Sequence, residues 1–258
     1  MASRHCIDLN SDLGEGYGPW PMGEDAAMLA IVSSANIACG GHAGDAETMF
    51  ATLTQARGEG VTVGAHPGYA DCPGFGRRII PMSIAEIERM VAMQIGALMG
   101  VAALAGVQVA YVKAHGALAN FAADNVDVAM AVARATAAVS RELALLAISG
   151  TELETAGAKA GLQVFSEVFA DRAYLPNGRL VPRGNPAAMI HDPDFAARRL
   201  ITLLETGLMP TLDGPAIALA AQSICVHGDS PGAVTMARHV RSALSAAGVA
   251  IAPFLRPE

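Results

Sequence analysis

The sequence has no run of lysines or arginines, and its net charge is −7 at neutral pH. Nucleic acids and anionic membranes are bound by basic patches, so neither is an expected partner. The four cysteines contain no CxxC pair, and no apolar signal segment follows the first residues. These absences predict a reduced, cytoplasmic protein with free thiols rather than an exported, disulfide-bonded one.

Short motifs with a known chemistry are also missing. The chain has no GxxxxGK[ST] loop, no GxGxxG after a predicted strand and no HExxH pair. Motifs alone therefore predict no nucleotide-phosphate cradle and no zinc-protease helix. No linker or internal repeat divides the chain. Its 258 residues are 52% hydrophobic and 16% charged, which predicts one folded domain, residues 1–258, with a large core.

Residues 90–112 carry almost no charge and are long enough to span a bilayer. The segment is nevertheless rich in alanine and glycine, contains Gln94 and Gln108, and breaks at residues 105–107. We therefore predict a buried helix that turns into a strand, and no membrane span.

Apolar segments alternate with helical segments along the chain. Helix starts are indicated by Asp45, by a capping box at Ser83 and Glu86, by Asp124, and by Asx–Pro or Ser–Pro pairs at residues 192–193 and 230–231. Strands are expected at residues 6–10, 34–39, 61–64, 107–113, 143–148, 162–168 and 220–226. Such alternation predicts parallel strands with helical crossovers. Seven strands favour an α/β fold with a closed or nearly closed (β/α) barrel, and a doubly wound open sheet is the alternative.

An acidic stretch follows the first strand, with Asp8, Asn10, Asp12 and Glu15 in eight residues. Strand alternation places Asp8 and Asn10 on one side, facing the barrel interior. Asp12 and Glu15 are expected in the loop beyond, as the groups that carry chemistry. In either fold, ligands bind at the carboxyl ends of the strands.

Four of the seven histidines stand beside Gly or Pro at predicted strand ends: His42, His66, His115 and His227. Neutral imidazole suits both metal binding and proton transfer near pH 7. Asp12 with His66 and His115 would make a divalent-metal site with open positions. Structural histidines at strand ends are the competing interpretation.

Basic residues accompany these strand ends. Lys113 precedes His115 by two residues, which places both on one face of a strand. Arg77, Arg172 and Arg183 lie in glycine-rich or long loops, where a guanidinium can bind a carboxylate or phosphate. Ordinary surface charge is the alternative for each arginine. Cys39 and Cys225, inside apolar strands, are expected to be inert buried thiols.

Several segments, in order, resemble the LamB/YcsF family. They are DLNSDLGE at 8–15, SANIACGGHAGD at 34–45, GAHPGY at 64–69, GFGRR at 74–78, VKAHGAL at 112–118, EVFADR at 167–172 with LVPR at 180–183, and VHGD at 226–229. The resemblance extends over essentially the whole chain. It implies a distorted seven-stranded (β/α) barrel similar to the glycoside hydrolase/deacetylase superfamily.

The activity that the resemblance implies is the ATP-dependent hydrolytic opening of 5-oxo-L-proline to L-glutamate, with release of ADP and phosphate. ATP, with magnesium, would be used by a complex of this chain with two partner subunits, of B and C type. Whether this chain itself holds a divalent metal, and whether it forms a homo-oligomer, stays open.

Roles follow from this expectation. Asp12 or a neighbouring histidine is expected to activate water. The catalytic set is Asp12, His66, Lys113 and His115. The set for substrate or phosphate is Asn10, Glu15, His42, Arg77, Arg172, Arg183 and His227. One competing function is a metal-dependent deacetylase or hydrolase of carbohydrate or amide substrates that works without ATP, and another is a non-catalytic metabolite-binding module.

Overall fold

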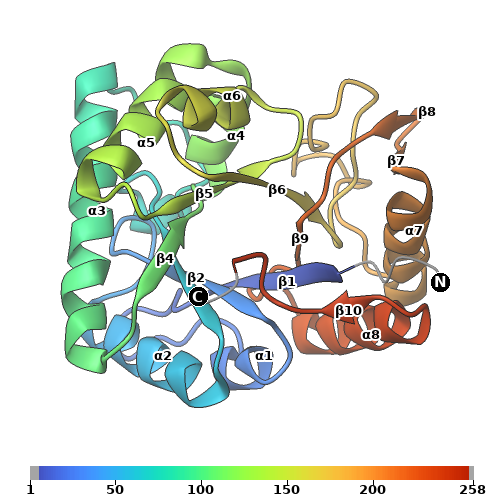
Figure 1. The fold of residues 1–258 in the computed structure, drawn as a ribbon, viewed down its shortest axis with the longest axis horizontal. Coiled ribbons are helices and arrows are strands. Elements are labelled where there is room, and N and C mark those ends of the chain that lie inside the picture. Colours follow the sequence, from blue (N-terminus) through green and yellow to red (C-terminus); the bar gives the residue numbers. More distant parts are fainter. Residues whose placement is uncertain (1–5, 256–258) are drawn as a thin grey trace.

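In the computed structural model, which describes residues 6–255, seven parallel strands close into a barrel (Figure 1). The strands are β1 (Cys6–Leu13), β2 (Ser34–Ala38), β3 (Thr62–His66), β4 (Val109–Val112), β5 (Ala144–Ile148), β6 (Val164–Phe169) and β9 (Ser223–Cys225). Each pairs with the next, and β9 pairs back with β1 between Asp8 and Ser223. This closure confirms the barrel and excludes the open sheet. The single domain expected over residues 1–258 extends beyond the described residues at both ends.

Helices surround the barrel on its outside (Figure 1). They are α1 (Asp25–Leu29), α2 (Ala46–Glu59), α3 (Ile84–Ala105), α4 (Gly116–Asp124), α5 (Val126–Val139), α6 (Glu152–Lys159), α7 (Pro193–Thr206) and α8 (Ala233–Ala246), with a short 3-10 helix at Cys72–Gly74. The predicted starts at Asp45, Ser83 and Asp192 are confirmed, since each side chain accepts backbone N–H groups of the first turn.

Two predicted helix starts are wrong. Asn125, rather than Asp124, caps α5, because its side chain accepts the N–H groups of Asp127 and Val128. Asp124 instead ends α4, a helix that the sequence did not predict because its alanine-rich segment has no capping signal of its own. Helix α8 begins at Ala233 after Gly232, whose φ of 79° ends the Ser–Pro turn before it.

Strand β1 is longer than predicted. It runs to Leu13, and Asn10 to Leu13 pair with Ser34 to Ile37 of β2. Asp12 is therefore a strand residue and not, as predicted, a loop residue. Polar residues usually mark the end of a strand, but the interior of this barrel is itself polar, so polar side chains continue the alternation.

The inward face of β1 carries this polar interior. Asp8 is completely buried and accepts hydroxyl hydrogen bonds from Ser33 at 2.6 Å and Ser34 at 2.7 Å, and another from Ser223. Burial raises the pKa of Asp8 to about 6, although the hydrogen bonds from the three serines act in the opposite direction. The predicted inward position of Asp8 is confirmed, and its hydrogen bonds are what make that burial tolerable.

One layer higher, Asn10 and Asn36 join the strands across the barrel. Asn36 Nδ2 donates to Asn10 Oδ1 at 2.7 Å and to Asp12 Oδ1 at 2.9 Å. Tyr111 donates its hydroxyl to Asn36 Oδ1 at 2.7 Å, and Asn10 Nδ2 donates to Ser223 at 2.6 Å. Each buried amide is thus satisfied within the network.

Below this network lies an aromatic floor. We use that name for Tyr111, Phe165 and Phe254. The ring of Phe254 lies 4.9 Å from that of Tyr111 and 4.7 Å from that of Phe165. Ala144 and Leu146 of β5 complete this small apolar cluster. The larger core lies outside the barrel, where the alternate residues Ile7, Leu9 and Leu13 of β1 face the helices.

Helix α3 has the length and hydropathy of a membrane span, with 22 residues. It packs in the helix layer instead, burying Ile87, Val91, Ile95 and Leu98 in the core. Its C-cap Gly106 has a φ of 66°, and β4 follows, so the predicted helix that turns into a strand is confirmed.

Three short strands were not predicted. β7 (Leu208–Thr211) and β8 (Gly214–Ala218) form an antiparallel hairpin outside the barrel, and β10 (Ala250–Ile251) pairs with the first two residues of β1. The hairpin turns through Asp213, which has a φ of 55°. Strands β7 and β8 contain Pro210 and Pro215, and proline is uncommon within strands, so no strand was predicted there.

Gly64 in β3 tests how tightly the interior is packed. A Cβ on Gly64 would lie inside the van der Waals surface of the Tyr111 ring. We expect Gly64→Ala to lower the free energy of unfolding by about 1–3 kcal/mol through overpacking. Urea unfolding measures this. The matched control is Gly58→Ala on α2, where a Cβ meets nothing within 4 Å. A neutral or stabilising Gly64→Ala would contradict the packing.

Candidate active site at the carboxyl end of the barrel

A cleft of about 470 Å³ opens where the carboxyl ends of the barrel strands meet. It is lined by predicted site residues from both halves of the chain: Asp12, His66, Arg77, Lys113, His115, Arg172, Arg183 and His227. The strand ends thus converge as expected from a barrel. Glu167, Phe169 and Arg179 also line the cleft, and the sequence had not marked them as site residues.

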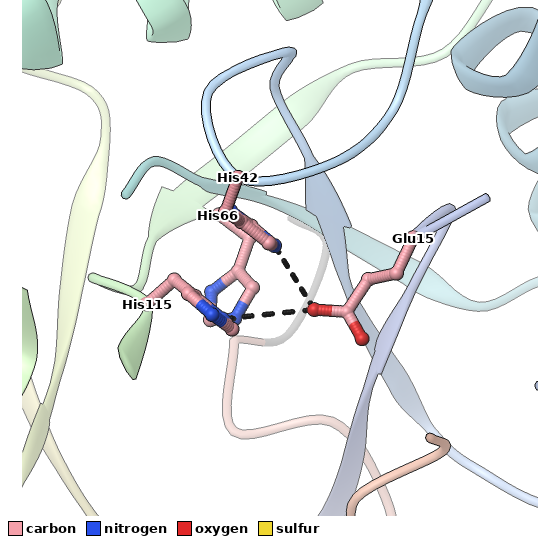
Figure 2. A group of neighbouring side chains, drawn as sticks. All are labelled: Glu15, His42, His66 and His115. Atoms are coloured by element: carbon pink, nitrogen blue, oxygen red, sulfur yellow. Dashed lines mark hydrogen bonds and ion pairs between the residues drawn. The ribbon is translucent and has the colours of Figure 1, made fainter. Parts of the chain in front are cut away.

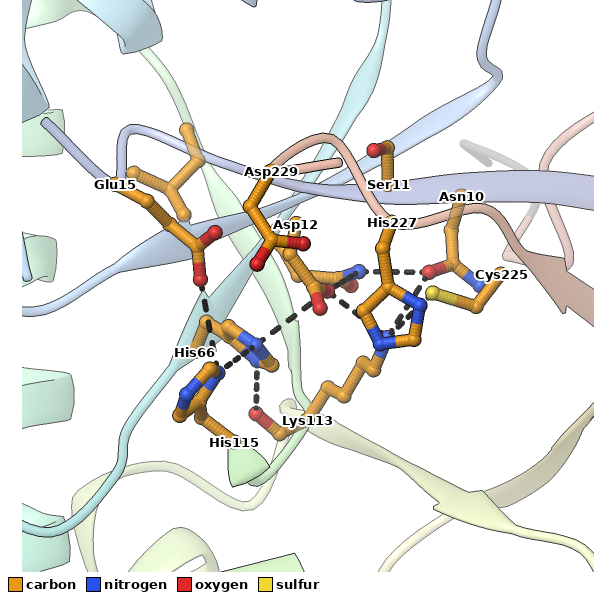
Figure 3. A network of polar contacts seen from close by, with 12 residues as sticks. Asn10, Ser11, Asp12, Glu15, His66, Lys113, His115, Cys225, His227 and Asp229 are labelled. Carbon is orange, nitrogen blue, oxygen red and sulfur yellow. Dashed lines mark hydrogen bonds and ion pairs between the residues drawn. The ribbon is translucent and has the colours of Figure 1, made fainter. Parts of the chain in front are cut away.

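Lys113 lies at the centre of the polar network beneath the cleft (Figure 3). Its ammonium is 2.9 Å from Asp12 Oδ1 and 3.0 Å from Glu167 Oε2. It also lies 3.2 Å from Asn10 Oδ1 and 3.1 Å from Cys225 Sγ. The side chain is only 3% exposed, so these contacts replace its hydration.

The three charged groups shift one another's pKa values. Burial lowers the pKa of Lys113, but the charge of Asp12, its hydrogen bond and the charge of Glu167 act together with Cys225 to outweigh burial, and the net pKa is well above the usual value. Burial raises the pKa of Asp12, whereas His66 and Lys113 bring it well below its usual range. Burial dominates at Glu167 and raises its pKa despite Lys113. Of the two carboxyl groups that contact Lys113, Asp12 therefore has a lowered pKa and Glu167 a raised one.

Glu167 could have been found from the sequence. It is a single carboxylate in the otherwise apolar end of β6, and the strands bury it almost completely. A buried carboxylate needs a partner, and a long-range contact with Lys113 supplies one.

Three histidines and Glu15 form a second cluster beside the lysine network (Figure 2). His42 Nε2 is 3.0 Å from Glu15 Oε1, and His115 Nδ1 is 3.6 Å from the same oxygen. His115 Nδ1 is also 3.0 Å from His66 Nε2. The rings of His42 and His115 stack with their centroids 3.6 Å apart. All four residues are buried.

Backbone groups hold these rings in place. His66 Nδ1 is 2.8 Å from the Lys113 carbonyl, and His115 Nε2 is 2.8 Å from the Phe75 carbonyl. The loop closes over the rings at Gly76, with a φ of 60°, where a Cβ would come within 2.7 Å of His42 Cβ. Only glycine allows this approach without displacing the rings.

Burial sets the protonation of this cluster. It lowers the pKa of His42 to about 4 and that of His115 well below its usual value, so both rings are neutral at pH 7. Burial and the charge of Asp12 raise the pKa of Glu15 to about 8. Glu15 and His42 do not line the cleft itself, and neither does Asn10, which lies beneath Lys113.

His227 is held apart from the other histidines. Its Nδ1 lies 2.8 Å from Asp171 Oδ2, and its ring stacks on Phe169 at 5.4 Å. Burial lowers the pKa of His227, but the charge and hydrogen bond of Asp171, together with the charge of Asp12, outweigh burial and the net shift is upward. His227 in turn lowers the pKa of Asp171, against the effect of burial. Asp171 was not predicted as a site residue, although it follows the same strand that carries Glu167.

Arginines give one side of the cleft a positive charge. Arg172 is buried and donates to the carbonyl of Val181 at 2.7 Å. Burial, with Arg183 nearby, lowers the pKa of Arg172 to about 10, which leaves it charged at neutral pH. Arg77 is paired with Asp229 at 2.5 Å.

Arg78, next to Arg77, donates to Asp71 and does not line the cleft. Cys39 and Cys225 are buried, as expected, and burial raises the pKa of both thiols. Cys225 nevertheless contacts the Lys113 ammonium, so it belongs to the polar network and not only to the core.

The LamB/YcsF family model matches residues 7–258, nearly the whole chain. The chain belongs to the LamB/YcsF family. A Rhodopseudomonas palustris (strain BisB18) relative, named as the A subunit of 5-oxoprolinase, is 52% identical over 249 residues, covering 96% of this chain and 98% of the relative. A Paracidovorax citrulli protein of the same name is 53% identical over 248 residues, covering 96% and 99%.

Solved structures agree with this LamB/YcsF assignment. The lactam utilization protein from Thermus thermophilus matches with a TM-score of 0.90 and 42% identity, covering 96% of this chain and 99% of that one. A protein from Enterococcus faecalis V583 shares the fold alone, with a TM-score of 0.55 and 12% identity over 98% of both chains. The motifs that resemble the LamB/YcsF family supply most of the cleft residues.

The ion pair between Asp171 and His227 makes stability depend on pH. Because the folded pKa of His227 is raised, its stabilisation is complete below the unfolded value of about 6.5 and is lost as pH rises through the folded pKa. Asp171→Asn is expected to lower the free energy of unfolding by about 1.5–3 kcal/mol at pH 6 and by less at pH 9. Urea unfolding at both pH values measures this.

The control for this prediction is Asp194→Asn, which removes the exposed partner of His239. It is expected to change the free energy of unfolding by less than about 1 kcal/mol at either pH. An equal loss at pH 6 and pH 9 for Asp171→Asn would show that His227 is uncharged in the folded protein.

Proposed function

We propose that this chain is the A subunit of an ATP-dependent 5-oxoprolinase, a hydrolase that opens the cyclic amide of 5-oxo-L-proline. The observation that carries the proposal is its identity of 50–53% to relatives of that name, over 96% of this chain and 98% or more of theirs. The solved relative named for lactam utilization supports the same substrate class.

The reaction explains why ATP is needed. A five-membered lactam is a stable amide, so its opening in water requires a second, favourable reaction. Transfer of the γ-phosphoryl group of ATP to the amide oxygen releases ADP and makes the ring carbon electrophilic. Water adds to that carbon, the bond to the ring nitrogen breaks with a proton delivered to nitrogen, and a second water releases phosphate. The products are L-glutamate, ADP and phosphate.

Asp12 and Glu167 have the properties of a base and an acid for these steps. The pKa of Asp12 is lowered and that of Glu167 is raised, and paired carboxylates separated in this way divide the two roles. In our proposal Asp12 accepts the proton of the attacking water and Glu167 protonates the ring nitrogen. Lys113 lies between them and holds both in place.

The arginine side of the cleft suits an anionic ligand. Arg172 is fixed by backbone carbonyls, and Arg183 lies at the exposed rim of the same cleft. A guanidinium pair of this kind binds a carboxylate or phosphate bidentately. We assign to it the substrate carboxylate or the transferred phosphoryl group, together with Arg77.

The proposal includes a complex. The relatives' names call them subunits, and we propose that this chain acts with B-type and C-type partners that complete the Mg-ATP-dependent reaction. The cytoplasm, where ATP is available, is the proposed location. Which subunit binds ATP is left to experiment.

The first test is an ATP-dependent assay of glutamate formation from 5-oxo-L-proline, with this chain alone and with both partners. We expect turnover only with the partners and only with ATP, with one phosphate released per glutamate. If the isolated chain instead deacetylated or hydrolysed a carbohydrate or amide substrate with metal and without ATP, the competing function would replace this one.

The second test concerns the two carboxylates. Asp12→Asn and Glu167→Gln are each expected to lower kcat of the reconstituted complex by about 10²–10⁴-fold, since each removes a proton-transfer group. Arg141→Lys, at an exposed position outside the cleft, is the control and should leave kcat unchanged. Unchanged turnover in Asp12→Asn would remove Asp12 from the role of base.

A further inference from the structure

The cluster of Glu15, His42, His66 and His115 is not used by the proposed acid–base chemistry. Its four side chains come from four different strand ends, and one ligand atom of each lies within 4.8 Å of all the others (Figure 2). Each residue is at most 5% exposed. Buried polar groups need partners, and these four face mainly one another.

The hydrogen bonds to the backbone decide where the ring protons are. A carbonyl oxygen can only accept, so the protons are on His66 Nδ1, which faces the Lys113 carbonyl, and on His115 Nε2, which faces the Phe75 carbonyl. With both rings neutral, His66 Nε2 and His115 Nδ1 are therefore both unprotonated, although they lie only 3.0 Å apart. Two lone pairs at this distance repel unless a positive species lies between them.

A metal ion accounts for this arrangement better than a shared proton does. One proton would join only His66 and His115, and a second would be needed between His42 Nε2 and Glu15 Oε1, whereas a single ion can serve all four atoms. A tetrahedral ion with metal–nitrogen distances of about 2.0–2.1 Å places its ligand atoms about 3.3 Å apart. Three of the six separations here are 3.0 Å between His66 and His115, 3.0 Å between His42 and Glu15, and 3.6 Å between His115 and Glu15, and all six are within 4.8 Å.

We propose that Glu15, His42, His66 and His115 bind one divalent first-row transition ion. Three imidazole nitrogens and one carboxylate suit zinc, manganese or iron, whereas magnesium and calcium prefer oxygen ligands. The carbonyls that accept from His66 and His115 are the outer contacts that normally orient metal-binding histidines. The rings of His42 and His115 stack in parallel, and His42 Nε2 and His115 Nδ1 both face Glu15 Oε1.

This ligand set differs from the one expected from the sequence, which was Asp12 with His66 and His115. Asp12 Oδ1 is engaged by the Lys113 ammonium and by the Asn36 amide, each at 2.9 Å. It remains a neighbour of the site, 3.4 Å from His66 Nε2. Glu15 and His42 take its place as ligands. An ion here would supply Lewis-acid chemistry at the wall of the cleft.

The test is zinc binding by the full chain after chelator treatment and dialysis, followed by isothermal titration calorimetry and elemental analysis. We expect one ion per chain. Glu15→Gln and His115→Gln are each expected to weaken binding by at least about 100-fold, more than the loss of an outer contact. His239→Gln, an exposed histidine, is the matched control and should bind zinc as the unsubstituted chain does.

Asp12→Asn separates the two ligand sets. We expect less than about 10-fold weaker binding, because Asp12 would act only on the surroundings of the ion. If Asp12→Asn abolished binding while Glu15→Gln left it unchanged, the proposed set would be wrong. Failure of the unsubstituted chain to bind any of zinc, manganese or iron would overturn the site altogether.

X-ray absorption of the zinc-loaded, unsubstituted chain gives a readout that does not depend on variants folding. We expect nitrogen and oxygen neighbours only, at about 2.0–2.1 Å, with imidazole scattering. A sulfur ligand would instead indicate Cys225, which lies with Asp12 and His227 in a second group of suitable atoms, and would overturn the proposal. The inference does not rest on the proposed function, because metal content and coordination are measured without turnover.

Discussion

The balance of charge around one buried lysine is the constraint on which the barrel interior depends. Lys113 compensates Asp12 and Glu167, three ionic groups that would each be costly to bury alone. They come from strands far apart in the chain, so the balance exists only when the barrel is closed. The amide and hydroxyl network below, through Asn10 and Asn36, depends on the same closure. The closed barrel and the candidate acid–base groups thus depend on the same ionic contacts.

The barrel could be predicted from the sequence because its strands are apolar runs alternating with capped helices. The errors came where the polar interior contradicts that pattern. A loop was predicted at Asp12 because acidic residues usually follow a strand, whereas here Asp12 faces inward within one. Glu167, at the start of the EVFADR segment, was not assigned to the site, although a carboxylate at an apolar strand end needs a partner. Its partner Lys113 becomes visible only when the strands are assembled.

The location of the candidate site could be predicted from the sequence, but the contacts between its residues could not. Histidines beside glycine or proline at four strand ends indicated where the site would lie, and three of them do meet. Which ring nitrogen faces which neighbour is set by the carbonyls of Lys113 and Phe75. Those carbonyls are placed by backbone geometry, so no pattern of side chains could reveal them. His227 pairs with Asp171 through a similar long-range contact.

The aromatic floor and the polar network share one side chain. The ring of Tyr111 packs against Phe254, and its hydroxyl donates to Asn36 Oδ1. Asn36 in turn donates to Asp12 Oδ1 at 2.9 Å. A substitution that shifts the Tyr111 ring therefore also moves a hydrogen-bond donor of the candidate active site, so the apolar end of the barrel is mechanically coupled to the end that carries the chemistry.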